Sequence, residues 1–120
     1  MARIMIADDS DAIRMVLKDI ISIGKHEFVA EASNGIETVE QFKKTNPDLV
    51  LLDMAMPKKD GLSVLKEIVG FKPTVKVIMI TASDSQITMK ECIKEGAAAY
   101  ILKPFNFEDV LRKITEVLNP

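Results

Sequence analysis

The sequence predicts an α/β protein in which five βα units form a doubly wound, three-layer sandwich. Two observations lead to this fold class. Short apolar runs alternate along the chain with segments of helical period, as expected when each strand is followed by a helix. Three of the runs, at residues 4–6, 49–52 and 77–80, are continuously apolar rather than alternating. Such strands belong to a parallel sheet that helices cover on both faces, with right-handed crossovers.

The apolar runs define five expected strands, at residues 3–7, 28–32, 49–52, 75–80 and 98–102. Between and after them, apolar residues recur at steps of three and four, so each segment carries one apolar stripe for the sheet. The stripes consist of Ile13, Val16, Leu17, Ile20 and Ile21; Ile36, Val39 and Phe42; Leu62, Leu65, Ile68 and Val69; Ile87, Met89, Cys92 and Ile93; and Val110, Leu111, Ile114, Val117 and Leu118.

Glycine and proline mark the ends of these segments. Gly24 and Gly96 stand where the C-terminal end of a helix needs a left-handed residue. Asn46-Pro47 and Asp60-Gly61 indicate turns.

Length and composition exclude several classes of protein. We expect residues 1–120 to form one domain, because this length is typical of a single hydrophobic core. A net charge of −2 with interspersed signs argues against nucleic-acid binding. No apolar run approaches the roughly 20 residues that span a bilayer. Cys92 is the only cysteine, which excludes an intrachain disulfide and suits a reducing compartment. We therefore expect a monomeric, cytoplasmic protein without membrane contact.

Polar side chains follow four of the five expected strands. Asp8 and Asp9 follow the first, Asp53 the third, Thr81 the fourth and Lys103 the fifth. Ligands of doubly wound sheets bind beyond the carboxyl ends of the strands, so these residues are expected at one edge. Each alone has an ordinary explanation, as a helix cap, a turn residue, a strand-end hydroxyl or a solvated surface lysine.

The combination favours a phosphoryl-transfer site. Three carboxylates at the ends of neighbouring strands repel one another unless a cation lies among them. Oxygen ligands without histidine or cysteine indicate Mg²⁺, with Mn²⁺ as an alternative. A lysine facing them can hold a phosphate oxygen. Carboxylates, a hard metal ion, an ammonium and a hydroxyl are together what phosphoryl transfer requires.

With these residues the whole chain resembles the receiver domains of response regulators in two-component signalling. The residues that carry the resemblance are Asp8-Asp9-Ser10, Asp53, Met56-Pro57, Asp60-Gly61, Thr81-Ala82 and Lys103-Pro104-Phe105. The resemblance implies the flavodoxin-like, CheY-like fold with parallel strand order 2-1-3-4-5. Within the family the chain is most similar to stand-alone chemotaxis regulators, which signal to the flagellar or archaellar motor. Tyr100 matches their switch aromatic.

The resemblance also implies the roles of the site residues. Asp53 would accept a phosphoryl group from a CheA-like histidine kinase, forming 4-aspartylphosphate, and Lys103 would stabilise the transferring oxygens. Mg²⁺ would bind Asp8, Asp9, Asp53 and the backbone carbonyl of Ala55. Such a protein is no enzyme in the usual sense, because it catalyses only its own phosphorylation and dephosphorylation.

A switch is implied as well. The Thr81 hydroxyl would move to bond the phosphoryl group, and Tyr100 would turn inward. This changes the face formed by the fourth helix, fifth strand and fifth helix, where a downstream switch or adaptor protein would bind; a phosphatase is a further expected partner. The Lys103-Pro104 peptide is expected to be cis, although sequence alone gives cis a low frequency.

Other functions fit parts of the pattern. A phosphorelay intermediate, passing its phosphoryl group to a histidine phosphotransfer protein, would have the same site. An aspartyl-phosphate phosphatase usually has a second acid two residues after the nucleophile, where this chain has Ala55. A nucleotide- or flavin-binding module would need a glycine-rich loop after the first strand. A docking-only receiver would not need its intact site residues. Ala55 and Ser83 also depart from the best-known chemotaxis pattern, which leaves the lifetime of the phosphorylated state open.

Overall fold

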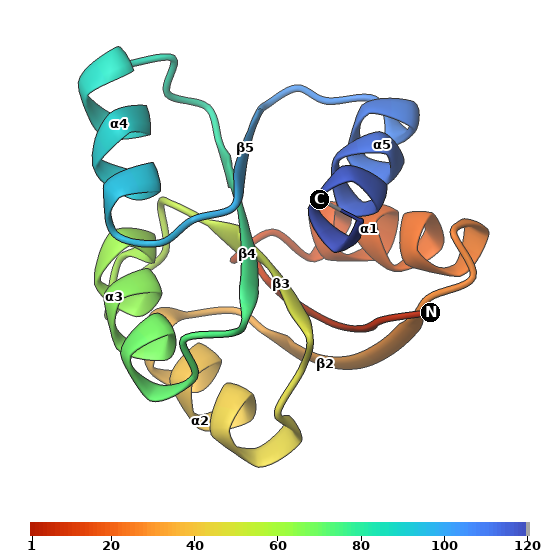
Figure 1. The fold of residues 1–120 in the computed structure, drawn as a ribbon, viewed down its shortest axis with the longest axis horizontal. Coiled ribbons are helices and arrows are strands. Elements are labelled where there is room, and N and C mark those ends of the chain that lie inside the picture. Colours follow the sequence, from red (N-terminus) through yellow and green to blue (C-terminus); the bar gives the residue numbers. More distant parts are fainter. Residues whose placement is uncertain (120) are drawn as a thin grey trace.

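The computed structural model describes residues 1–119 and shows strands and helices in strict alternation (Figure 1). The strands are β1 (Arg3–Ala7), β2 (Glu27–Ala32), β3 (Leu49–Asp53), β4 (Lys76–Thr81) and β5 (Ala99–Leu102). The helices are α1 (Asp11–Ile23), α2 (Gly35–Thr45), α3 (Gly61–Phe71), α4 (Gln86–Lys94) and α5 (Phe107–Leu118). None of the helices in this described part is long and apolar enough to cross a membrane.

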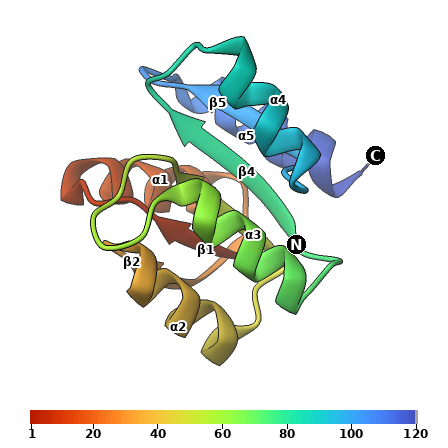
Figure 2. The same cartoon turned by 90° about the vertical axis from the view of Figure 1, so that its left-hand side faces the viewer.

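The strands form one sheet in the order β2-β1-β3-β4-β5, and every neighbouring pair is parallel. Helices α1 and α5 cover one face of the sheet, whereas α2, α3 and α4 cover the other (Figure 1). The predicted three-layer, doubly wound fold and its strand order are therefore confirmed. A view from the side places α4 near β5, far from α2 (Figure 2).

The continuous apolar runs are buried on both faces, as predicted. In β1, Ile4 and Ile6 pack in the cluster with α1 and α5, while Met5 and Ala7 pack in the cluster with α2, α3 and α4. Every residue of β3 is buried. Successive side chains of a strand point to opposite faces, so a strand between two helical layers is apolar on both faces. In β3 the exception is the last residue, Asp53, which lies at the predicted site.

Each helix begins at a residue whose side-chain oxygen accepts the backbone N–H three residues later. The five capping residues are Ser10, Asn34, Asp60, Ser85 and Asn106. Such caps pair backbone donors that the first helical turn leaves free. Four of the caps, before α1, α3, α4 and α5, stand in loops after strands that end at the predicted site, so the caps also define the paths of these loops.

The predicted apolar stripes are wider than the faces that the helices bury. Val16, Ile36 and Ile87 are 45%, 50% and 82% exposed, because only the centre of each stripe reaches the sheet. The expectation that Gly24 adopts a left-handed conformation is wrong: its φ is −75°, and Lys25 has the positive φ instead. Gly24 serves packing, because a Cβ there would lie 2.7 Å from Leu111 Cδ2 on α5.

Candidate functional site

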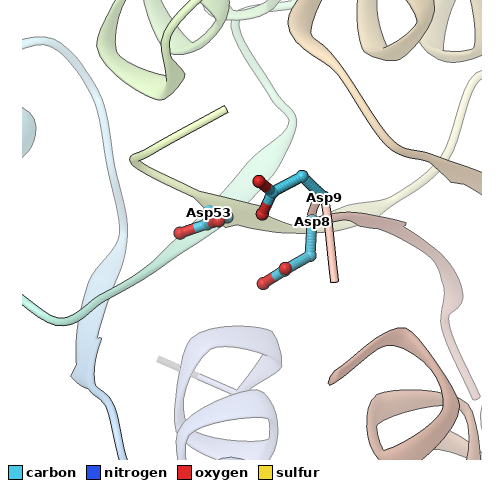
Figure 3. Close-up of side chains that lie close together, drawn as sticks. All are labelled: Asp8, Asp9 and Asp53. Carbon is cyan, nitrogen blue, oxygen red and sulfur yellow. The ribbon is translucent and has the colours of Figure 1, made fainter. Parts of the chain in front are cut away.

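Three carboxylates meet at the carboxyl ends of β1 and β3. These strands are neighbours in the sheet, with Ala7 opposite Leu52, so the residues that follow them lie side by side. Carboxylate oxygens of Asp8, Asp9 and Asp53 all lie within 4.8 Å of one another (Figure 3). Asp8 and Asp53 are buried, whereas Asp9 is exposed. The cluster is therefore open to solvent on the side of Asp9.

Asp8 is held at each of its polar atoms. Its N–H donates to the Ala32 carbonyl at 3.1 Å, and its carbonyl accepts from Arg14 Nη1 at 2.7 Å. In the side chain, Oδ1 accepts from the Ser10 N–H and Oδ2 from Lys103 Nζ, both at 2.9 Å. Burying a carboxylate is costly unless its oxygens are paired, so these bonds explain how Asp8 is tolerated at 1% exposure.

Lys103 faces the acidic cluster from the end of β5. Its Nζ lies 2.9 Å from Asp8 Oδ2 and 3.3 Å from Asp53 Oδ1, so one ammonium bridges two carboxylates. The Lys103 N–H donates to the Thr81 carbonyl at 2.7 Å, which continues the pairing of β5 with β4. The Lys103-Pro104 peptide is cis, as the family resemblance implies.

The electrostatics of the site leave negative charge in excess. Burial raises the pKa of the Asp53 carboxyl, and the charge of Asp8 raises it further, while Lys103 and the Ala55 N–H oppose them. Burial by itself lowers the pKa of the Lys103 ammonium, but its bonds and charge interactions with Asp8 and Asp53 outweigh burial and raise it. Three carboxylates face one ammonium, and all the donor atoms are oxygen, which fits a hard divalent cation.

Thr81 and Tyr100 lie beside the cluster rather than in it. Thr81 ends β4 directly after Ile80, the residue opposite Asp53, and is buried. The Thr81 Oγ1 accepts from the Ser83 N–H at 3.1 Å. The Tyr100 hydroxyl donates to the Ser83 carbonyl, also at 3.1 Å. Both predicted switch residues therefore bond to the same residue of the loop between β4 and α4.

The structure thus brings Asp8, Asp9, Asp53 and Lys103 into one cluster, with Thr81 at its border. Tyr100 is linked to Thr81 through the loop residue Ser83, which bonds both side chains. Ala55 follows Asp53 on the exposed side, and its N–H lies 3.4 Å from Asp53 Oδ1. The roles assigned to these residues, including the Ala55 carbonyl as a ligand, stay predictions.

Two further residues shape the site, although the sequence pattern does not assign them to it. Arg14 bonds the Asp8 carbonyl, and a basic residue one turn into the helix after an acidic pair is the only local signal for this contact. For Gly61 the sequence indicates only a turn. A Cβ at Gly61 would lie 2.4 Å from the Asp53 carbonyl oxygen, so glycine is needed for α3 to start against the end of β3.

Comparisons with known proteins point to one family. The family model described as the response regulator receiver domain matches residues 4–115. The chemotaxis protein CheY of Bacillus subtilis is 42% identical over 117 residues, 98% of both chains. CheY of Thermotoga maritima is 40% identical over 115 residues, 96% of both chains. A chain in the crystal structure of the CheX-CheY-BeF3-Mg+2 complex from Borrelia burgdorferi superimposes with a TM-score of 0.95 and 32% identity, over 98% of this chain and 90% of that one.

Proposed function

The chain belongs to the response regulator receiver domain family, and from that premise we propose that it is a chemotaxis response regulator phosphorylated on Asp53. Residues 1–120 would form one receiver domain that takes a phosphoryl group from a histidine kinase and signals to a flagellar or archaellar motor. The observation that carries the proposal is the Lys103 ammonium bridging Asp8 and Asp53 beside a third carboxylate. The chemotaxis role is supported by the similarity to CheY proteins over nearly their full lengths.

Asp8, Asp9 and Asp53 would hold Mg²⁺, with the Ala55 carbonyl as a further ligand. The all-oxygen donor set and the excess of carboxylates over ammonium support this assignment. The similar CheY of Borrelia burgdorferi was crystallised in a complex that contains Mg²⁺, which supports it further. When bound, the ion would supply electrostatic stabilisation for negative charge on the transferring phosphoryl oxygens.

In this reaction the protein forms only one covalent bond, through Asp53. An Asp53 carboxylate oxygen attacks the phosphorus of a phosphohistidine, and the phosphorus–nitrogen bond breaks with its electron pair leaving on the imidazole. A small acyl phosphate would react in the same way, losing its carboxylate. Lys103, already 3.3 Å from Asp53, is placed to donate to a phosphoryl oxygen. The chain acts only on itself in this scheme.

The signal would leave the site through Thr81 and Tyr100. A phosphoryl group carries roughly 1.5 to 2 negative charges, in place of the single charge of the Asp53 carboxylate, and brings strong acceptor oxygens close to the Thr81 hydroxyl. If Thr81 turns to bond it, the hydroxyl releases the Ser83 N–H, and the loop that also holds Tyr100 is free to rearrange. A downstream switch or adaptor protein would then bind the face of α4, β5 and α5, and a phosphatase would end the signal.

Acetyl phosphate tests the acceptor directly. With Mg²⁺, the protein should gain a base-labile adduct about 80 Da heavier, one phosphoryl in place of a proton, measured by mass spectrometry. Chelating the metal should prevent it. Asp53→Asn should abolish the adduct, whereas Asp19→Asn, which removes a carboxylate from α1 outside the acidic cluster, should not. An adduct of unchanged yield in Asp53→Asn would disprove the acceptor, and no adduct in the unsubstituted protein would disprove the proposed function.

A further inference from the structure

Arg14 is a largely buried arginine whose three nitrogens each bond a different partner. Its Nη1 donates to the Asp8 carbonyl at 2.7 Å and its Nε to Glu31 at 2.8 Å, while Nη2 donates to Asp11. The side chain is only 13% exposed. Glu31 is held in turn by Lys18. The guanidinium therefore ties the end of β1 to both α1 and β2.

The position of Arg14 in α1 explains how it reaches the strand end. Its N–H donates to the carbonyl of Ser10, the cap of α1, so it stands one turn into the helix. Side chains on a helix lean toward its N-terminus, which here points back to Asp8. A planar guanidinium can serve three acceptors in one plane, whereas a lysine ammonium on a flexible stem cannot reproduce that arrangement.

Asp9, by contrast, is held only through its backbone. Its carboxylate is exposed and makes no hydrogen bond or ion pair with any residue from 1 to 119. The peptide before Asp9 is fixed by the bond from Arg14 to the Asp8 carbonyl. The peptide after it is fixed by the Ser10 N–H, which donates to Asp8 Oδ1. These two bonds therefore fix the backbone on both sides of Asp9, from which its side chain extends.

We propose that Arg14 is a positioning residue for the divalent cation site: by holding the Asp8–Asp9 peptide against β2, it presents the Asp9 carboxylate to the ion. The inference rests on the proposed function, because it assumes that the acidic cluster binds a cation. It assigns to α1 and β2 a part in metal binding although neither element supplies a ligand.

The sign of the effect separates positioning from simple electrostatics. Arg14 carries a positive charge next to a site for a cation, so its charge alone repels the ion. If charge were the whole effect, neutralising Arg14 would strengthen Mg²⁺ binding. If Arg14 orients Asp9, the same substitution weakens it. The two explanations therefore predict opposite changes of one measured constant.

The test is the Kd for Mg²⁺, measured by calorimetric titration of the folded proteins. Groups that orient metal ligands typically change affinity by about 10- to 100-fold when removed, and we expect about tenfold weaker binding for Arg14→Gln. Arg14→Lys keeps the charge but loses the three-way bonding, so it should weaken binding as well. Arg112→Gln is the matched control: Arg112 pairs with Asp109 and Glu116 on α5 and should leave the Kd unchanged.

A double-mutant cycle shows whether Arg14 acts through Asp9. In an Asp9→Ala background, Arg14→Gln should have little further effect on the Kd, because the carboxylate that it orients is gone. Effects that add fully, or an Arg14→Gln variant that binds Mg²⁺ as well as or better than the unsubstituted protein, would overturn the inference. If the unsubstituted protein neither binds Mg²⁺ nor forms the acetyl phosphate adduct, the proposed function fails and the inference with it.

Circular dichroism and urea unfolding establish that each variant is folded. Should both Arg14 variants unfold, Glu31→Gln leaves the arginine in place and loosens its anchor. It should weaken Mg²⁺ binding more than Glu27→Gln, which removes a charge from the same strand away from Arg14. Equal effects of the two glutamate substitutions would count against positioning.

Discussion

The acidic end of the sheet and the neighbouring region around α4 are held in different ways. At the acidic end (Asp8, Asp9, Asp53 and Lys103), Asp8 is bonded at each polar atom, and α1 behind it buries Leu17, Ile20 and Ile21. The α4 region, here α4 with the loop from β4, buries a single helical residue, Cys92. The site is thus built on the firmly packed part of the fold and adjoins a thinly packed part.

This contrast shows where a chemical change at the site is most easily converted into movement. Segments with few buried apolar contacts open at low free energy, whereas core elements open only with global unfolding. The two regions are joined by Ser83, which bonds both Thr81 and Tyr100. If the proposed function is correct, a charge added at Asp53 would leave the firmly packed acidic end in place and would move the more weakly packed α4 region.

The largest difference in the free energy of unfolding should come from replacing one apolar residue with alanine on α1, behind the acidic end, and one on α4. Leu17 on α1 is 1% exposed, and Leu17→Ala should lower the free energy of unfolding by about 2–5 kcal/mol, because it leaves a cavity. Ile87 on α4 is 82% exposed, and Ile87→Ala should change it by less than about 0.5 kcal/mol. Urea unfolding measures both. Similar losses would show that α4 is as well packed as α1.

Mg²⁺ should increase the difference in local stability between the two regions, because it should slow local opening at the acidic end and not in α4. At an ion concentration 100 times the Kd, the free energy of unfolding should rise by about 2.7 kcal/mol. Hydrogen exchange should slow at the ends of β1 and β3 but not in α4, since the ligands all come from the acidic end. Asp53→Asn should reduce the stabilisation. Equal protection of α4 would contradict a local effect of the ion.

A pair of glycines in α3 tests how closely the fold packs against the site. Gly61→Ala would place a Cβ 2.4 Å from the Asp53 carbonyl oxygen, so backbone must shift, at a cost of about 1–3 kcal/mol and with weaker Mg²⁺ binding. Gly70 has no atom within 4 Å of an added Cβ, and Gly70→Ala should stabilise the helix by up to about 1 kcal/mol. Thermal unfolding compares them. An unaffected Kd for Mg²⁺ in Gly61→Ala would show that β3 tolerates the shift.

The sequence alone predicts the covered sheet and the edge that carries the site, but it does not predict the order of the strands. Strands apolar on both faces predict a covered parallel sheet, and all its carboxyl ends share one edge. That geometry places Asp8, Asp53 and Lys103 at the same edge, but whether they meet depends on which strands are neighbours. The strand order came from the family resemblance, because periodicity does not say which strands are neighbours.

The packing of α4 beside the edge strand β5, and the contacts made by the two ends of α1, could not be predicted in the same way. Ile87 and Ile93 have helical spacing, but β5 is a four-residue edge strand and offers too little surface to cover them. The contact of Arg14 with the Asp8 carbonyl depends on the angle between α1 and β1, which no local pattern contains. For the same reason the sequence does not reveal that Lys25, rather than Gly24, takes the left-handed conformation after α1.

The smallest effect is expected when the hydrogen bond between β5 and the loop before α4 is removed. Tyr100→Phe removes the hydroxyl that donates to the Ser83 carbonyl, a bond with a net worth of about 0.5–1.5 kcal/mol. Hydrogen exchange should become faster in residues 82–94, while the Kd for Mg²⁺ stays unchanged, because the Tyr100 hydroxyl bonds a loop carbonyl and not a carboxylate of the acidic end. Thr115→Val is the control, since it removes a hydroxyl bonded to a backbone carbonyl on α5 and should leave the exchange of α4 as it was. A changed Mg²⁺ affinity in Tyr100→Phe would mean that the two regions are coupled even without a phosphoryl group.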